Sequence, residues 1–203
     1  MDKQKIQDLL QVFLTLQVTK ELPRQGFINF GFKRNESDSV AAHSFTVCAL
    51  SFLLARYLEQ QGYDCSADRA LRIALVHDMG EAISGDIGYH VKRFAGELLD
   101  KVEEQTFGML VEKLDIQAEL TDLYHEYKEL ESPESKIVKC ADALDAYTQM
   151  LLTPGANLRS QQSFVDEKSK ELSGDLVLGN FVSDFFNQAI LLLKKREVHF
   201  IGE

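Results

Sequence analysis

The segment LVHDMGEAISGD, residues Leu75 to Asp86, starts as an apolar run and then carries four ionisable side chains. These are His77, Asp78, Glu81 and Asp86. Burying such groups beside apolar neighbours is costly unless each finds a partner. Residues three or four apart are neighbours on a helix, so we expect His77, Asp78 and Glu81 to share one helical face. The sequence therefore raises the question of which partner these ionisable side chains share.

Two glycines in this segment also carry structural predictions. Gly80 lies inside the expected helix, where glycine costs about 1 kcal/mol relative to alanine. We therefore expect Gly80 to let another part of the molecule approach the backbone closely. Gly85 should end the helix in a left-handed conformation and let Asp86 turn back towards the same end. The helix itself should start at a cap provided by Ser66.

The rest of the chain predicts a single all-α domain. The chain has 203 residues, only 3 of them proline, and apolar residues recur at helical rather than alternating spacing. We expect one domain over 1–203, with a motif-bearing core at about 22–150 and C-terminal helices at 151–203. A long loop at about 20–39 and a short basic connector at 88–96 interrupt the helices. Segment 157–173 is ambiguous. The expected helices span about 6–14, 39–58, 66–84, 97–114, 120–130, 133–152 and 181–197.

Charge and cysteine content limit the class of partner and the compartment. The net charge is −10, from 22 basic and 32 acidic residues, which argues against a nucleic acid polymer as partner. A small anionic substrate remains compatible, because a local cationic cluster or a metal can attract it. The three cysteines show no paired spacing and are interpreted as reduced thiols of a cytoplasmic protein. We find no signal-peptide core and no apolar run of membrane-spanning length, so we expect no membrane association.

Two further ionisable residues lie within apolar helical segments. His43 lies in SVAAHSFTVCAL and Asp142 in KIVKCADALDAY. Together with His77 and Asp78 they make a set of two imidazoles and two carboxylates, which suits one divalent metal ion. Each residue also has a simpler interpretation. His43 could hydrogen-bond a backbone carbonyl, Asp142 could pair with Lys139, and Asp145 is a rival ligand on nearly the same face.

The order His, then His-Asp, then Asp on separate helices resembles the HD superfamily of metal-dependent phosphohydrolases. The surrounding segments LPRQGF, SVAAHS, ALVHDMGEAISGDI and SPESKIVKCADALDA are similar to the branch that contains the 5′-deoxynucleotidases. The resemblance covers roughly residues 22–147. It implies an HD-type helical bundle with the metal site between helices, in an enzyme that works in nucleotide metabolism.

The resemblance implies a role for each matching residue. His43, His77, Asp78 and Asp142 correspond to the metal ligands, and the ion could be Mn, Co, Zn, Ni, Fe or Mg. The other implied roles are catalytic for Glu81 and Asp86, phosphate binding for Arg24, and substrate binding for Phe27 and Lys92.

Two positions depart from the family pattern, and two histidines suggest an alternative. Ala42 stands where the branch usually has an acidic residue, and Phe27 stands where an aromatic near the arginine is often Trp. These departures put a contact near the metal and the nucleotide preference in doubt. His90 and His125 fall where larger HD phosphodiesterases place ligands to a second metal. A basic connector for His90 and an ordinary amphipathic helix for His125 are the stronger explanations of these two histidines.

The predicted activity is hydrolysis of (deoxy)ribonucleoside 5′-monophosphates to nucleoside and phosphate by metal-activated water. No nucleophilic cysteine or serine is required. One alternative is another HD hydrolase that acts on a phosphodiester, a nucleoside triphosphate or a signalling nucleotide. The other is an inactive nucleotide-binding regulator. Family members are often dimers, so a homodimer is possible.

Overall fold

The structure is a computed structural model in which residues 2–152, 170 and 176–195 are described. Over these residues the chain is helical, and the only extended pairing is an isolated bridge between Pro23 and Ser39. The prediction of an all-α fold is therefore confirmed for the described part of the chain. The ambiguous segment 157–173 lies almost entirely outside the described residues.

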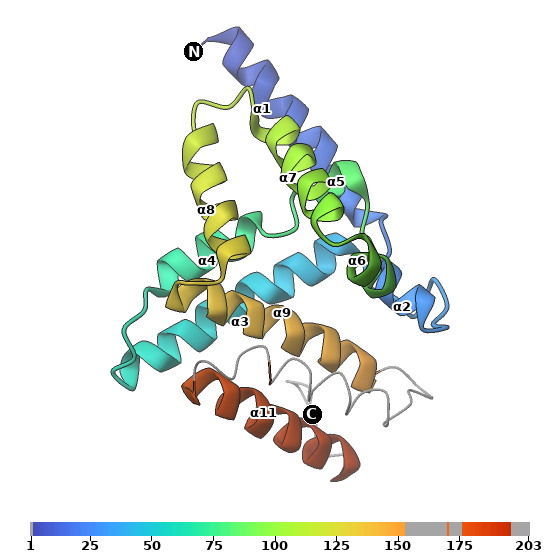
Figure 1. Ribbon diagram of the computed structural model, residues 1–203, viewed down its shortest axis with the longest axis vertical. Helices are drawn as coiled ribbons and strands as arrows, with labels where there is room; N and C mark the ends of the chain where they lie inside the picture. Colours follow the sequence, from blue (N-terminus) through green and yellow to red (C-terminus); the bar gives the residue numbers. More distant parts are fainter. Residues whose placement is uncertain (1, 153–169, 171–175, 196–203) are drawn as a thin grey trace, which may run out of the picture.

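The core is formed by three helices that cross one another, with a fourth against them (Figure 1). The buried side chains of these helices are mainly aliphatic and leave almost no surface exposed, for example Val47, Ile73 and Leu144 at 0%. Burial of a side chain of this size stabilises the fold by about 1.5–3 kcal/mol. The four helices are α3 (Val40–Gln60), α4 (Ala67–Val76), α9 (Pro133–Leu152) and α8 (Gln117–Glu129).

A second group of helices packs beside this core and lies mostly on the right of the upper half of Figure 1. It contains α1 (Lys3–Leu16), η1 (Gln17–Lys20), α5 (Glu81–Ser84), α6 (Tyr89–Ala95) and α7 (Glu97–Val111). The short α2 (Gln25–Asn29) lies inside the predicted loop. On the opposite side, α11 (Leu176–Lys195) packs against α9. The ring centroids of Tyr147 and Phe186 lie 3.8 Å apart in this contact.

Helix α3 is long and apolar enough, by length and composition alone, to cross a membrane. The buried core helix of a soluble protein meets the same criterion. In this structure α3 packs against both α4 and α9 and buries residues along its whole length, from Val40 to Leu58. Packing inside the bundle accounts for the buried residues of α3, whereas Phe45, Leu53 and Tyr57 on the same helix are more than half exposed.

Serine side chains cap three of the helices, including the predicted cap at Ser66. Ser39 caps α3 by accepting the Ala42 N–H at 3.2 Å. Ser66 accepts the Arg69 N–H at the start of α4, and Ser132 precedes Pro133 and accepts the N–H of Ser135 at the start of α9. Because each hydroxyl satisfies an otherwise unpaired N–H, the helix starts could be read from the sequence.

The predicted helix over 66–84 is wrong in one respect that matters for the site. Helix α4 ends at Val76, residues 77–80 form turns, and α5 begins at Glu81. The N–H groups of Met79 and Glu81 donate to carbonyls three residues back. His77, Asp78 and Glu81 therefore do not lie on one continuous helical face. The tighter turns instead point the two ligand-type side chains into the bundle.

The close approach predicted at Gly80 is confirmed, although Gly80 lies in the turn before α5 and not inside a helix. The positive φ predicted at Gly85 is also confirmed, but the helix that it ends is the short α5 and not one that starts at Ser66. Gly85 has a φ of 75°, which suits glycine, and it ends α5. A Cβ on Gly80 would lie 3.3 Å from both the Cβ and the N of Phe107 on α7. Gly80 therefore allows α7 to approach the turn that carries Asp78.

We predict that Gly80→Ala destabilises the fold by about 1–3 kcal/mol, because the added methyl group overpacks against Phe107. The backbone of Gly80 is in the ordinary right-handed region, so the effect should be steric. Gly108→Ala in α7 is the control, since a Cβ there meets nothing within 4 Å. It should stabilise the fold by about 0.5–1 kcal/mol. Chemical denaturation measures both, and equal stability of the two variants would contradict the close approach.

Candidate metal centre

Four ligand-type side chains from three places in the sequence converge between the helices. His43 projects from α3, Asp142 from α9, and His77 and Asp78 from the turn after α4. The Nε2 atom of His77 lies 3.1 Å from Oδ2 of Asp78. The Nε2 atom of His43 lies 3.5 Å from the same Asp78 oxygen and 3.4 Å from Oδ1 of Asp142. These are the four residues proposed as ligands from the sequence.

In each of the two imidazole rings Nδ1 has a polar partner, whereas Nε2, which faces the cluster, has none. His77 uses Nδ1 to contact the carbonyl oxygen of Ala74 at 2.7 Å, and His43 uses Nδ1 to contact Oδ2 of Asp145 at 2.6 Å. Both Nε2 atoms are buried and have no hydrogen-bond partner. A buried nitrogen without a partner is unfavourable, and two such atoms facing two carboxylates fit a bound cation.

Asp142 is held in a similar way. Its Oδ2 accepts hydrogen bonds from the Tyr127 hydroxyl at 3.2 Å and from Lys139 at 3.1 Å, while Oδ1 faces His43. The simpler interpretation of Asp142 as the partner of Lys139 is thus correct, yet one oxygen is still left for the cluster. Asp145, the rival ligand, contacts the opposite edge of the His43 ring. Geometry therefore favours Asp142 as the ligand.

The residues present fit a divalent cation. Ligand atoms of His43, His77 and Asp78 all lie within 4.8 Å of one another, and Oδ1 of Asp142 adds a second carboxylate. Imidazole nitrogens and carboxylate oxygens together suit Zn²⁺ and other divalent first-row ions. The four side chains would hold the ion, with Asp142 binding through one oxygen.

Electrostatics of the cluster agree with this interpretation. Burial disfavours the charged form of Asp78, but His77 and His43 outweigh it and keep the pKa of Asp78 below its ordinary value. Lys139 and His43 likewise outweigh burial and hold the pKa of Asp142 well below its usual range. Both carboxylates are therefore ionised at neutral pH and can bind a cation.

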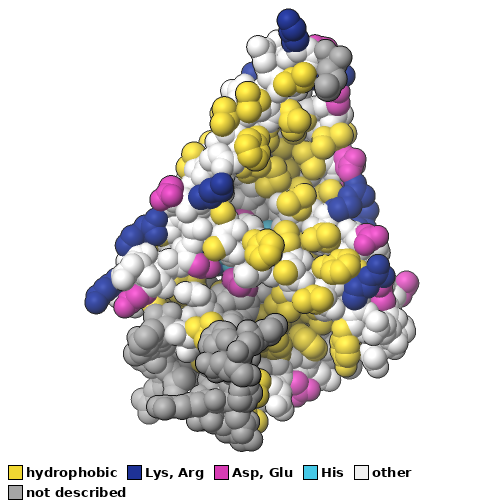
Figure 2. All heavy atoms as spheres, turned by 180° about the vertical axis from the view of Figure 1, so that it is seen from behind, with side chains coloured by type: hydrophobic (Ala, Val, Ile, Leu, Met, Phe, Trp, Pro, Cys, Tyr) yellow, Lys and Arg dark blue, Asp and Glu magenta, His cyan; other side chains and the backbone are white. Residues whose placement is uncertain are grey.

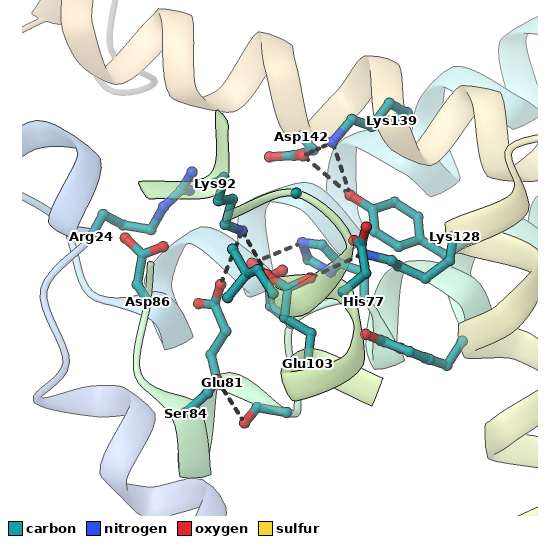
Figure 3. A pocket seen from close by; sticks show the side chains of 17 residues that line it. Arg24, His77, Glu81, Ser84, Asp86, Lys92, Glu103, Lys128, Lys139 and Asp142 are labelled. Carbon is teal, nitrogen blue, oxygen red and sulfur yellow. Dashed lines mark hydrogen bonds and ion pairs between the residues drawn. The ribbon is translucent and has the colours of Figure 1, made fainter. Parts of the chain in front are cut away.

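A polar cavity of about 260 Å³ opens beside the cluster (Figure 3). Its wall includes three of the ligand-type side chains together with cationic and acidic groups from α6, α7, α8 and the loop before α2. Its polar and aromatic lining residues are Arg24, His77, Asp78, Glu81, Ser84, Asp86, Lys92, Asp100, Glu103, Tyr124, Tyr127, Lys128, Lys139 and Asp142.

Glu81 lies at the floor of this cavity and is only 8% exposed. Its Oε2 atom is buried without a partner, and its Oε1 atom lies 4.0 Å from Nζ of Lys92. Burial, with the negative charges of Asp78 and Asp86, raises the pKa of Glu81 from 4.5 to about 10. Lys92 only partly offsets this rise. The carboxyl is thus favoured in its neutral form beside the cluster.

Arg24 and Asp86 lie side by side in the wall of the cavity (Figure 3). Oδ2 of Asp86 accepts the backbone N–H of Gln25, which ties the segment after α5 to the loop that carries Arg24. Nη1 of Arg24 is buried without a partner. Burial opposes the charge of Arg24, but Asp142, Asp78 and Asp86 outweigh it and raise its pKa. Arg24 is therefore a permanent cation that faces the cluster and has one hydrogen-bond donor without a partner.

The other residues singled out from the sequence lie at different distances from the site. Lys92 lines the cavity and bridges Glu81 and Glu103, the latter at 3.2 Å. Phe27 is buried beneath the guanidinium group of Arg24, 5.9 Å from its ring centroid, and is not among the described residues that line the cavity. Phe27 therefore supports Arg24 and does not contact the cavity directly.

Neither histidine of the second-metal alternative can be placed in the cluster. Nε2 of His125 lies 3.4 Å from Glu104 on an exposed part of the surface. The side chain of His90 lies outside the described residues. Ala42 is exposed on α3.

Several site residues were missed in the sequence. Tyr127 lies in the helix predicted over 120–130, where no motif marks it, yet a buried tyrosine hydroxyl usually needs a partner and that of Tyr127 donates to Asp142. Lys128 and Glu103 also line the cavity and pair at 2.9 Å. Both are ordinary charged helix residues with no local motif, so only the tertiary structure brings them to the site.

Comparison with known proteins agrees with this geometry. Residues 16–177 match the HD domain family. The chain belongs to the HD-domain family. The resemblance to its 5′-deoxynucleotidase-like branch is also confirmed by relatives that carry this name. One from Bos taurus is 31% identical over 144 residues, covering 70% of this chain. One from Citrobacter koseri is 30% identical over 166 residues, covering 73% of this chain and 80% of the relative.

The matched part spans 66% of the Bos taurus protein and 65% of a relative from Schizosaccharomyces pombe. Solved structures extend the likeness over nearly the whole chain. A protein from Pyrococcus horikoshii has a TM-score of 0.70 at 34% identity, covering 87% of this chain and 99% of that one. A predicted metal-dependent phosphohydrolase from Magnetospirillum magnetotacticum has a TM-score of 0.70 at 20% identity and covers 93% and 96%, so it shows the shared fold.

We predict that Glu81→Gln stabilises the metal-free protein, increasingly so as pH rises. Below pH 4.5 the carboxyl is protonated in both folded and unfolded states. Between 4.5 and about 10, unfolding releases its proton, so wild-type stability falls with rising pH by at most about 1.4 kcal/mol per unit. Glutamine carries no proton to release. The advantage of the variant should therefore grow by about 1–2 kcal/mol from pH 6 to pH 8.

The measurement is urea denaturation of chelator-treated wild type and variant at both pH values. Glu112→Gln, which removes an exposed carboxylate, is the control. A stability difference that stays constant between pH 6 and pH 8 would contradict the protonated state of Glu81.

Proposed function

We propose that this protein hydrolyses nucleoside 5′-monophosphates, deoxyribonucleotides included, to nucleoside and phosphate with the help of one divalent cation. The main support is the buried Nη1 atom of Arg24, which has no partner and faces the cluster. An arginine can grip two phosphate oxygens through parallel hydrogen bonds. A terminal phosphate held there would lie between Arg24 and the proposed ion.

The relatives support the same substrate class. Proteins named 5′-deoxynucleotidase occur among them in animals, in a fission yeast and in a bacterium. All residues that the resemblance assigns to metal, catalysis, phosphate and substrate binding are present here, and all but Phe27 contribute to the cluster or the cavity wall. A chain-wide charge of −10 does not oppose this proposal, because Arg24, Lys92, Lys128 and Lys139 gather in one cavity.

The reaction needs a water to attack phosphorus as the bond to the 5′-oxygen breaks. A divalent cation at the cluster would activate the water and polarise a phosphoryl oxygen. Glu81 orients the water and accepts its proton. Its ionised form becomes easier to form once the charge of Asp78 is neutralised, because Asp78 is one cause of its raised pKa.

Asp86 and the cationic residues serve the leaving group and the phosphate. One oxygen of Asp86 is held by Gln25, and the other can protonate the leaving 5′-oxygen or accept a hydrogen bond from a sugar hydroxyl. Arg24 and Lys92 balance the charge that builds up on the phosphoryl oxygens. The products are a nucleoside and inorganic phosphate.

The direct test is a panel of nucleotides assayed with Mn²⁺, Co²⁺, Zn²⁺, Ni²⁺, Fe²⁺ and Mg²⁺. We expect phosphate release from nucleoside 5′-monophosphates and from none of the 3′-monophosphates. Pyrophosphate or triphosphate release, or cleavage of a diester, would assign the protein to another HD hydrolase class. Nucleotide binding without turnover under every metal would indicate a regulator.

We predict that Arg24→Ala lowers kcat/KM for a 5′-monophosphate by about 10–100-fold while keeping the fold and the bound metal. The backbone of Arg24 is held by Asp38 and Ser37, and the substitution does not touch those hydrogen bonds. Arg24→Lys should recover little activity, because an ammonium group cannot make the two-pronged contact.

The control for this variant is Arg56→Ala, which removes an arginine paired with Glu59 on the outer surface of α3. Steady-state kinetics and elemental analysis measure both effects. If Arg24→Ala has the kcat/KM of wild type, the residue does not bind phosphate.

We further propose that the protein acts in the cytoplasm and can form a homodimer. The free cysteines support the cytoplasmic compartment.

The apolar stripe of α1 supports the dimer, because its residues Ile6, Leu10 and Phe13 are about half exposed. This helix lies at the narrow end of the apolar face in Figure 2. A stripe of this kind can pair with its own copy about a twofold axis. Light scattering of the wild type tests the dimer.

A further inference from the structure

One carboxylate beside the cluster has no role in the mechanism above. Asp145 lies one helical turn after Asp142 on α9, and its side chain is 16% exposed. Its Oδ2 atom lies 2.6 Å from Nδ1 of His43, on the side of the ring that faces away from the cluster. Its Oδ1 atom accepts the hydroxyl of Thr46, also at 2.6 Å. Both oxygens are therefore used.

We propose that Asp145 is a positioning residue for the metal centre, and that Thr46 acts through it. Asp145 accepts a hydrogen bond from Nδ1–H of His43, which places the other ring nitrogen, Nε2, as a lone pair towards the cluster. Thr46 fixes the rotamer of Asp145. The proposal deepens the metal site on which the proposed function rests, and it assigns a task to two residues outside the ligand set.

The geometry supports a directional role rather than simple charge balance. His43 is fully buried, so its ring has no water to hold it. If the ring carried its proton on Nε2, that N–H would face the cluster and could not bind a cation. A carboxylate on Nδ1 favours the binding tautomer and also fixes the ring orientation.

Thr46 is well placed for its part. It lies one turn after His43 on the same helix, and its hydroxyl also contacts the carbonyl oxygens of Ala42 and His43. A single hydroxyl hydrogen cannot serve all three acceptors at once, and the 2.6 Å contact to Asp145 is the shortest of them. Helix α3 thus supplies the ligand, and the same helix also holds the group that orients it.

The experiment measures Mn²⁺ affinity of the metal-free protein by chelator competition, with no nucleotide present. Asp145→Ala should weaken Mn²⁺ binding by about 10–100-fold, the usual effect of losing such an outer partner. Asp145→Asn should lose less, because its amide oxygen still accepts the Nδ1 hydrogen bond. Thr46→Val should weaken binding less than Asp145→Ala, and Thr46→Ser should bind as wild type does.

The double variant Asp145→Ala with Thr46→Val is the decisive comparison. If Thr46 acts only through Asp145, the double variant should bind Mn²⁺ no more weakly than Asp145→Ala alone. Additive losses would overturn the relay. Circular dichroism melting of the metal-free variants is measured beside it, since a loss of fold would lower affinity for a different reason.

Two control variants separate positioning from charge and from ligation. Asp38 is another carboxylate close to His43, and its Oδ1 atom has no hydrogen-bond partner. Asp38→Asn removes a similar charge without touching Nδ1, so it should weaken binding much less than Asp145→Ala. Asp142→Ala should abolish binding. Equal losses in Asp38→Asn and Asp145→Ala would overturn the positioning role, and so would wild-type affinity in Asp145→Ala.

The outcome is separate from that of the proposed function. The Mn²⁺ measurement contains no substrate, so failure to hydrolyse any nucleotide would leave the result for Asp145 intact. Conversely, an active enzyme whose Asp145→Ala variant binds Mn²⁺ normally would reject this inference alone.

Discussion

The structure depends on keeping two buried imidazoles, each with one unpaired nitrogen, next to two partly buried carboxylates. In a protein interior an imidazole nitrogen without a partner, or a carboxylate beside another carboxylate, is destabilising unless a cation balances it. Here Nε2 of His43 and of His77 remain unpaired while every outer atom is satisfied. Such an arrangement persists only if the surrounding helices hold it, and the packing of α3, α4 and α9 provides that support.

The same constraint explains why the chain breaks its helix at the most informative motif. A continuous helix through residues 66–84 would have kept His77 and Glu81 on one face, one turn apart. The turns after Val76 instead send His77 and Asp78 into the bundle and start α5 at Glu81, with Gly80 packed against Phe107. The backbone of residues 77–80 lacks regular helical hydrogen bonding. As a result, one short segment contributes side chains to both the metal cluster and the cavity wall.

Much of the fold and part of the site could be predicted from the sequence. Apolar periodicity and serine caps are local signals, so the helices containing His43 and Asp142 were placed correctly. Local sequence signals cannot distinguish Asp142 from Asp145 as the ligand, because both lie on nearly the same face of α9. The two differ in the edge of the His43 ring that each contacts. Lys128, Glu103 and Tyr127 were also missed as site residues because no spacing rule brings α7 and α8 to the cavity. The break after Val76 was missed because apolar periodicity carries no signal for it, and the neighbouring contact between Gly80 and Phe107 involves another helix.

The loop before α2 shows how a non-helical segment can still hold a residue in place. The N–H of Arg24 donates to the carbonyl of Asp38 at 3.1 Å, and the carbonyl of Arg24 accepts the Ser37 hydroxyl at 3.1 Å. On its far side the next residue, Gln25, donates its N–H to Asp86. Arg24 is therefore fixed both to the start of α3, which carries His43, and to the segment after α5. Such anchoring lowers the entropy that a flexible arginine would lose on binding phosphate. It also makes the positions of ligand, catalytic carboxylate and phosphate-binding cation depend on one another.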